Sequence, residues 1–404
     1  MQLSCVMRII GISMLAALPV LGELKLEPTL HMRAIAGESS ADHLEDLASH
    51  GHDPNNNFAL QGLELGTSLY YGDDISGFVN MNAFSTPDHE MEAEWEEGFL
   101  KYTGVDGFEI RGGRFLNRLG GQNNQHLHSW DFVDANLSTG LFLGEEGLRT
   151  DGGELNWISE FDTGFLAISG SFGEAVQHSH GHGEEDDHGD EDDHGDEDDH
   201  GDEDEHGHGE ESENAYFSGD LANIRVLFGY NHTDFHQHRF GLNGAWGENG
   251  YGHETSIYST DYTYTWREKG LESGGKEISL GLEYYLREVE WEHAENASNR
   301  GKTSQSSLMA IAKYRFSDEW VGDFRYGWIE GAEAGAEIDE GEVEYAFASE
   351  ERKRLSLALT REIDLYKDTR SCVRLQYNHD DLEEGSENSV WLQFGFDFGP
   401  GEVR

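Results

Sequence analysis

Apolar and polar side chains alternate one by one through most of this chain. In residues 258–266 the even positions carry Tyr, Thr and Trp, and the odd positions carry Ser, Thr and Asp. In residues 390–398 the even positions carry Val, Leu and Phe, whereas Gln393 and Asp397 stand at odd positions. The same pattern recurs in 63–69, 278–286 and 373–377. Because successive side chains of a strand point to opposite faces, the pattern predicts strands with one apolar and one polar face.

Sixteen segments show this pattern. They are residues 24–35, 57–71, 74–86, 93–103, 107–114, 152–160, 163–172, 217–230, 235–248, 254–266, 276–289, 305–316, 319–330, 352–363, 371–380 and 388–398. Long connections at 36–56, 115–151, 173–216 and 331–351 alternate with short turns, as in outer-membrane barrels. The sequence therefore predicts an all-β fold, a transmembrane antiparallel β-barrel of about sixteen strands with long external loops and periplasmic termini. An alternative for residues 341–348 is a strand extension above the membrane.

The alternative to a membrane barrel is a soluble β-sandwich or barrel with its apolar face inward. Three features favour the membrane. Aromatic residues lie near strand ends, as at membrane interfaces: Tyr258, Trp266 and Trp328. Ionisable residues lie in the middle of the polar faces, which suits a wet lumen: Glu64, Glu283, Asp323, Arg325 and Arg374. The strands are also long for a soluble sheet, roughly 9–13 residues. A barrel of this size leaves an aqueous channel.

The two ends of the chain lie outside the predicted barrel, which covers residues 23–398. Residues 1–22 resemble a secretory signal peptide, with Arg8 before an apolar stretch at 9–21. Residues 399–404 form a short tail after Phe398. Cys5 lies in the signal, so Cys372 is the only cysteine expected in the mature chain. This excludes a disulfide framework and zinc sites of the cysteine type.

An acidic, histidine-rich insertion occupies residues 174–213, in a predicted external loop. It holds 20 Asp and Glu, eight His and no Lys or Arg, with four near-copies of a hexapeptide that each end in His-Gly. Imidazole suits Zn, Cu and Ni, and carboxylates add oxygen ligands. The candidate ligands are His178, His180, His182, His188, His194, His200, His206 and His208. The alternative is a solvated acidic loop that has no role in metal binding.

A second candidate metal site lies in the 115–151 connection. His126 and His128 are spaced by one residue, so both rings lie on the same side of an extended chain and could reach one ion. The alternative is that they hold this loop against the barrel wall, together with Trp130 and Asp131. A third set of histidines lies in the first external loop: His43, His50 and His52.

One stretch carries a family resemblance. Gly113-Arg114-Phe115, the run Gln-His-Leu-His-Ser-Trp-Asp-Phe-Val-Asp at 125–134, and Phe142-Leu143-Gly144 resemble the zinc-regulated outer-membrane porins. The similarity extends through 155–157, 374–377 and 391–394 and spans nearly the whole mature chain. The resemblance implies a porin-like barrel whose expression responds to zinc supply.

These observations predict a porin in the outer membrane of a Gram-negative-type bacterium. It would admit small hydrophilic solutes, serve the acquisition of zinc or other divalent cations, and bind metal weakly through its acidic loop. We expect no enzymatic activity and no required cofactor; Zn²⁺ or another divalent cation is the candidate ion. The expected partners are outer-membrane lipid, divalent metal ions and further copies of the chain, whereas the net charge of −54 excludes nucleic acid. Two alternatives stay open: a metal-binding surface protein anchored by a barrel, and an outer-membrane hydrolase.

Overall fold

The computed structural model describes residues 24–400, apart from 42–43, 45–46, 88, 145–146, 177–213, 273, 295, 340–341, 367–368 and 384. The expected signal peptide at 1–22 and tail residues 401–404 lie outside the described residues. So do His43 and all eight candidate histidines of the 174–213 insertion. Among the described helices, none is long and apolar enough to cross a membrane.

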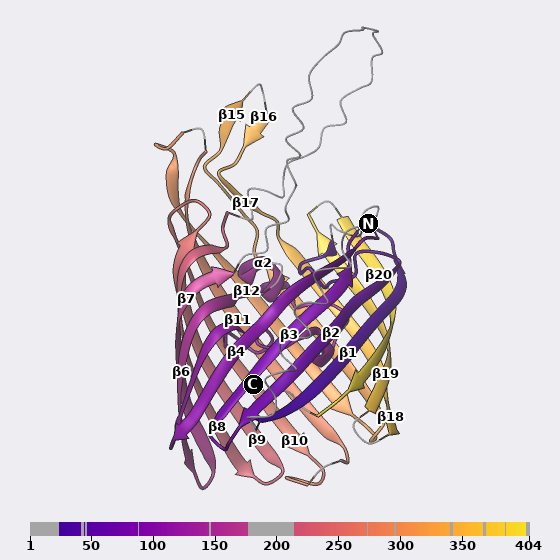
Figure 1. Ribbon diagram of the computed structural model, residues 1–404. Helices are drawn as coiled ribbons and strands as arrows, with labels where there is room; N and C mark the ends of the chain where they lie inside the picture. Colours follow the sequence, from indigo (N-terminus) through magenta and orange to yellow (C-terminus); the bar gives the residue numbers. More distant parts are fainter. Residues whose placement is uncertain are drawn as a thin grey trace, which may run out of the picture.

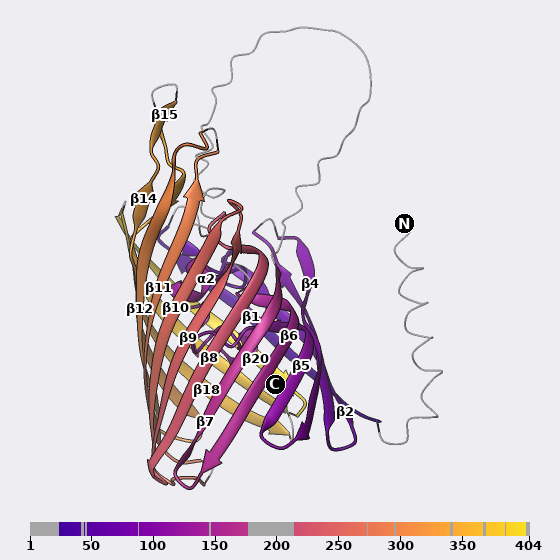
Figure 2. The same cartoon turned by 90° about the vertical axis from the view of Figure 1, so that its left-hand side faces the viewer.

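Sixteen antiparallel strands form a closed barrel (Figures 1 and 2). They are β1 (Leu24–Ser39), β2 (Phe58–Tyr71), β3 (Ile75–Ser85), β4 (Met91–Val105), β5 (Phe108–Leu116), β6 (Arg149–Phe161), β7 (Gly164–Val176), β8 (Phe217–Thr233), β9 (His236–Asn249), β10 (Glu254–Arg267), β11 (Glu277–Glu292), β12 (Arg300–Arg315), β13 (Trp320–Ile329), β18 (Arg352–Tyr366), β19 (Thr369–Leu382) and β20 (Gly385–Phe398). Strands that follow one another in the sequence pair with one another. The barrel closes where β1 pairs with β20, from Leu30 opposite Phe398 to Ser39 opposite Ser389. Closure pairs the backbone of both edge strands, as lipid requires.

All sixteen predicted strands are present, and the differences lie at their ends. The strand predicted from residue 305 begins at Arg300, because β11 continues to Glu292 and pairs with it there. The connection predicted at 331–351 forms two small sheets. These consist of β14 (Ala332–Ala334) with β17 (Phe347–Ser349) and of β15 (Glu337–Asp339) with β16 (Glu342–Glu344). They stand above the barrel at its long-loop end (Figure 1).

The apolar face of the barrel points outward. Leu65 is 52% exposed whereas its neighbour Glu64 is 1% exposed, and Leu282 and Glu283 repeat this contrast. Aromatic side chains accompany both rims of this surface. Trp246 donates a hydrogen bond to the Tyr258 hydroxyl near the long-loop end, and Phe316 stacks on Trp320 near the short-turn end. This arrangement is the reverse of a soluble barrel and is that of a membrane-spanning one.

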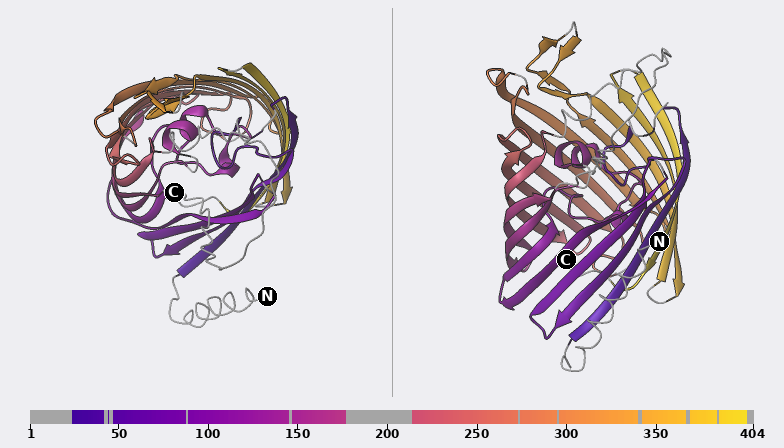
Figure 3. Two further views of the ribbon diagram at one scale, coloured as in Figure 1. Left: turned by 90° about the horizontal axis from the view of Figure 1, so that it is seen from above. Right: turned by 45° about the horizontal axis from the view of Figure 1, so that its top comes forward.

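The sequence predicted a long external connection at residues 115–151. In the structure this connection between β5 and β6, residues 117–148, instead folds into the barrel. We call it the inward loop; it contains η3 (Leu127–Ser129) and α2 (Leu137–Leu143). Seen from above, both short helices lie within the ring of strands (Figure 3). The reason is an apolar patch on the inner wall, against which α2 buries Leu137, Phe142 and Leu143. The wall residues of this patch include Leu221, Ala245, Ile257, Tyr285 and Ile329.

Candidate functional site

Asp134 fastens the inward loop to the inner wall. Its carboxylate accepts a hydrogen bond from Arg325 Nη2 of β13 at 2.6 Å and from Arg354 Nη1 of β18 at 2.7 Å. Gln376 and Asn378 of β19 donate to the same carboxylate at 2.8 and 3.0 Å. The Asp134 residue is 1% exposed, so these charge-assisted bonds form away from bulk water, where they are strong.

The charge of Asp134 is maintained by these partners. Burial alone would raise the pKa of the Asp134 carboxyl, but the guanidinium groups of Arg325 and Arg354 outweigh burial and hold this pKa below its ordinary value of 3.8. Asp134 is therefore ionised at neutral pH, and the attachment of the loop is an ionic one.

Further arginines bind carbonyl groups of the inward loop. Arg33 donates to His128 O at 2.7 Å and Arg374 donates to Trp130 O at 2.8 Å. Two arginines of other strands also donate to the loop: Arg225 of β8 to Gly120 O and Arg287 of β11 to Leu141 O, both at 2.9 Å. Arg325 and Arg374, predicted from sequence as lumen charges, are thus engaged by the loop.

His126 and His128 lie on the inner wall beside β2 and β4. His128 Nδ1 is 2.6 Å from Glu64 Oε2, and the His128 backbone N–H donates to Glu64 Oε1 at 3.0 Å. His126 Nε2 is 3.1 Å from Glu97 Oε2, and its Nδ1 is 3.9 Å from Glu64 Oε2. The His31 ring stacks on His128 with centroids 3.7 Å apart. These contacts are those expected if the histidines hold the loop against the wall; a metal role for them stays a prediction.

The first external loop, residues 40–57, brings two more histidines to the same region. His52 Nε2 lies 3.4 Å from Glu94 Oε1 and 3.3 Å from Glu96 Oε1, both on β4. The His50 ring meets Trp130 of the inward loop edge to face, with centroids 5.0 Å apart. Burial, assisted by His52, holds the pKa of the His50 imidazole well below its ordinary value of 6.5, so this ring is neutral at neutral pH.

The sequence did not reveal the carboxylates of β4. A β-bulge lies in this strand: Asn80 of β3 is opposite Glu97 and Met81 is opposite Trp95, which leaves Glu96 as the extra residue. Glu96 and Glu97 are consequently both buried on the inside of the barrel. In the sequence, the sign of this bulge is the pair of adjacent acidic residues in a strand whose polar and apolar residues otherwise alternate. Such a pair does not stand out in a chain with 81 Asp and Glu.

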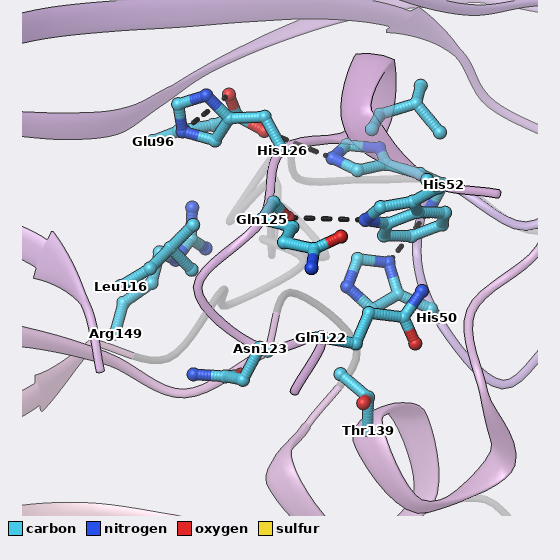
Figure 4. A pocket seen from close by; sticks show the side chains of 13 residues that line it. His50, His52, Glu96, Leu116, Gln122, Asn123, Gln125, His126, Thr139 and Arg149 are labelled. Atoms are coloured by element: carbon cyan, nitrogen blue, oxygen red, sulfur yellow. Dashed lines mark hydrogen bonds and ion pairs between the residues drawn. The ribbon is translucent and has the colours of Figure 1, made fainter. Parts of the chain in front are cut away.

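Two cavities adjoin the inward loop. One, of about 20 Å³, is surrounded by His50, His52, His126 and Glu96 (Figure 4). The other, of about 230 Å³, lies between the loop and strands β10–β13. Its charged lining has both signs: Asp131, Asp261, Glu283, Lys313 and Arg325. The lumen thus offers hydrogen-bonding and ionic partners to a hydrophilic solute.

Comparison with solved structures identifies the type of barrel. The anion-selective porin from Comamonas acidovorans is similar with a TM-score of 0.52 and 11% identity, over 93% of this chain and 100% of the porin. The trimer form of OmpT, an outer-membrane protein of Vibrio cholerae, gives a TM-score of 0.51 and 10% identity, over 93% and 99%. A loop-deletion mutant of OmpT gives 0.50 and 12%, with the same coverage. Identities this low establish the fold alone.

Sequence comparison adds little to this. No protein-family model matches the chain. A stretch of 115 residues is 30% identical to an uncharacterized protein of Aquifex aeolicus, over 27% of this chain and 24% of that protein. The chain thus spans about a quarter of the length of the curated relative it matches. Membership of the zinc-regulated porins stays a prediction from the residues quoted above, while in fold the chain is similar to outer-membrane porins.

Proposed function

We propose that this chain is a passive outer-membrane channel for small hydrophilic solutes that serves the acquisition of zinc or other divalent cations. The observation that carries the channel proposal is the inward loop. A barrel of sixteen strands has an interior too wide for its wall side chains to fill. Here a tethered loop narrows that interior and leaves a cavity lined by charges of both signs. Such an interior suits the passage of small polar solutes.

The proposal also covers the orientation of the barrel in the membrane and its assembly into oligomers. The start of β1 and the end of β20 lie toward the short-turn end of the barrel, which would be periplasmic. We further propose homo-oligomers, since one of the similar porin-type structures is a trimer form.

The alternative functions differ from a channel in what they predict. A barrel that only anchors a metal-binding surface protein would form no stable open channel, and a hydrolase would cleave lipid or peptide with an activity lost on a single Ser or His substitution.

Conductance in planar bilayers tests the channel. We expect stable open channels with a weak preference for cations, because the net charge is −54 and two lumen arginines, Arg325 and Arg374, are engaged by the inward loop. The preference should fall as salt rises, since salt screens charges at the mouth of the channel. Single-channel recordings with and without zinc, and reversal potentials across a salt gradient, measure this. Silent bilayers would contradict the channel, and reversal potentials that favour anions would contradict the selectivity.

The histidine-rich insertion is proposed to bind zinc reversibly and weakly. Each hexapeptide offers one imidazole, so a site with two nitrogen ligands must recruit histidines from different repeats. Binding should decline as the pH falls through the imidazole range, because the ligand must be neutral. Calorimetry on a peptide of residues 174–213, compared with the peptide in which all eight His are Asn, measures this. Equal zinc affinity in the two peptides would leave an acidic ion-binding segment and remove the zinc-specific interpretation.

A further inference from the structure

Three buried side chains converge where the first external loop meets the inner wall. His52 comes from the loop, and Glu94 and Glu96 come from β4. Their ligand atoms lie within 4.8 Å of one another, and all three residues are buried. The backbone of the loop is fixed at this point, because Gln61 Nε2 donates to His52 O at 2.9 Å. The backbone that carries the imidazole is therefore held by a group outside the cluster.

The distances from His52 Nε2 to the two carboxylates match those between ligands of a tetrahedral ion. Zinc binds imidazole nitrogen at about 2.0–2.1 Å and carboxylate oxygen at about 2.0–2.2 Å. Two such ligands at a tetrahedral angle are therefore about 3.3–3.5 Å apart. His52 Nε2 lies 3.4 Å from Glu94 Oε1 and 3.3 Å from Glu96 Oε1. A charge-assisted hydrogen bond would instead bring nitrogen and oxygen to about 2.7–2.9 Å.

The neighbouring Glu64–His126–His128 cluster differs in this respect. His128 Nδ1 is 2.6 Å from Glu64 Oε2, a hydrogen-bond distance that is too short for two ligands of one ion. The Glu64–His128 contact is thus one that fastens the inward loop, whereas the distances around His52 are those between ligands of one ion.

A buried amide gives independent support. Asn82 of β3 is 1% exposed, and its amide nitrogen is placed 3.2 Å from His52 Nε2. Its side-chain oxygen has no hydrogen-bond partner in the described part of the chain. The oxygen and nitrogen of an amide exchange places on a half-turn of the group, which would direct this oxygen at the cluster. An oxygen in that position is a ligand for a bound cation, and without an ion it accepts from His52 when Nε2 carries the proton.

The small cavity beside the cluster has room for a further ligand. It measures about 20 Å³ and is lined by His52, Glu96, His50 and His126. A water molecule needs at least about 10–15 Å³ of such space. A water molecule in this cavity can therefore supply a fourth ligand.

We propose that His52, Glu94 and Glu96 form a binding site for a divalent transition-metal ion, with Zn²⁺ the best match, on the inner wall of the barrel. One imidazole and two carboxylates, with water or the Asn82 amide as a fourth ligand, suit zinc in type and number. A bound ion would join the first external loop to strand β4. This inference rests on the divalent-cation part of the proposed function but does not require conduction.

Zinc-edge anomalous diffraction from crystals of the full-length protein tests the site. We expect a peak about 2 Å from His52 Nε2 in the wild type. His52→Asn and Glu96→Gln should each lose this peak and bind one zinc equivalent fewer by equilibrium dialysis. The matched control is Glu92→Gln, because Glu92 lies on the same strand and is exposed nearer the rim. This control should keep both the peak and the stoichiometry of the wild type.

Several outcomes separate the possibilities. Heat-modifiable migration on gels identifies any variant that has not folded, and the wild-type diffraction needs no variant. Wild-type crystals at saturating zinc without a peak at His52 would overturn the site, as would a peak that survives in both His52→Asn and Glu96→Gln. A conducting channel without this peak would remove the metal site and keep the channel. The peak in a barrel that does not conduct would do the reverse.

Discussion

Replacing Asp134 with alanine should release the inward loop from the wall and raise the conductance of the channel. The substitution leaves Arg325 and Arg354 buried without their shared carboxylate. Removing one partner of a buried ion pair typically costs about 3–5 kcal/mol. The loop carries its own bonds elsewhere, so the cost should appear as local opening while the barrel stays folded. Single-channel recording should show larger and noisier currents, and limited proteolysis should cut within residues 117–148.

Asp131→Ala is the matched control for this substitution. Asp131 lies three residues earlier in the same loop and forms an ion pair with Lys313. The side chains of this pair are 27% and 35% exposed for Lys313 and Asp131, and ion pairs open to solvent contribute about 0–1 kcal/mol. We therefore expect Asp131→Ala to keep the quiet currents and the protease resistance of the wild type, and to show a lower cation preference because it removes a carboxylate that lines the lumen cavity. Identical behaviour of the two variants would show that Asp134 is not the fastening point.

Acid should imitate the loss of Asp134. The folded pKa of this carboxyl lies below its ordinary value of 3.8, so its contribution to stability is complete above that value and disappears as the pH falls through the folded pKa. Wild-type conductance should therefore stay low from neutral pH to about pH 4 and rise only in stronger acid. The Asp134→Ala channel, recorded over the same pH series, should lack this rise.

The strands were predictable from the sequence because their physics is local. In lipid every strand needs an apolar outward face, and the lumen needs a polar one, so the alternation is written residue by residue. The inward position of residues 117–148 is not local. It depends first on an apolar patch to which five separate strands contribute on the inner wall. It also depends on the ion pairs of Asp134 with Arg325 and Arg354, which lie 191 and 220 residues further along the sequence. No pattern within the loop records those partners.

The candidate site was predictable only in part for a related reason. The spacing of His126 and His128 identified them as a pair, and their association with Glu64 is now visible. The location of His52 next to Glu94 and Glu96 depends on a long-range event, because the first external loop must descend onto the wall. Glu94 and Glu96 share the inner face by ordinary alternation, whereas the bulge in β4 turns Glu97 inward beside them. A bulge shifts the alternation without changing any residue type, so the sequence pattern does not reveal where the shift occurs.

Gly140→Ala should destabilise the contact between α2 and the first external loop. A Cβ atom at residue 140 would lie 1.6 Å from the carbonyl oxygen of Ser49, so one backbone must move away from the other. In an ordinary helix the same change is stabilising by about 1 kcal/mol. Here overpacking should reverse the sign and cost about 1–3 kcal/mol. Urea titration of the refolded barrel should show a lower free energy of unfolding, with the closed barrel retained in native conditions.

The same substitution should weaken zinc binding at the proposed site, because Ser49 and His52 belong to one loop and a shift of Ser49 draws His52 away from Glu94 and Glu96. Gly121→Ala is the control within the inward loop. Its Cβ would meet only the Glu283 carboxylate oxygens, at 3.9 and 4.0 Å, which is ordinary contact. That variant should keep the stability and the zinc stoichiometry of the wild type. If Gly140→Ala proved as stable as Gly121→Ala, the close backbone contact between α2 and the first external loop would not exist in solution. The proposal that this contact positions His52 would then be wrong.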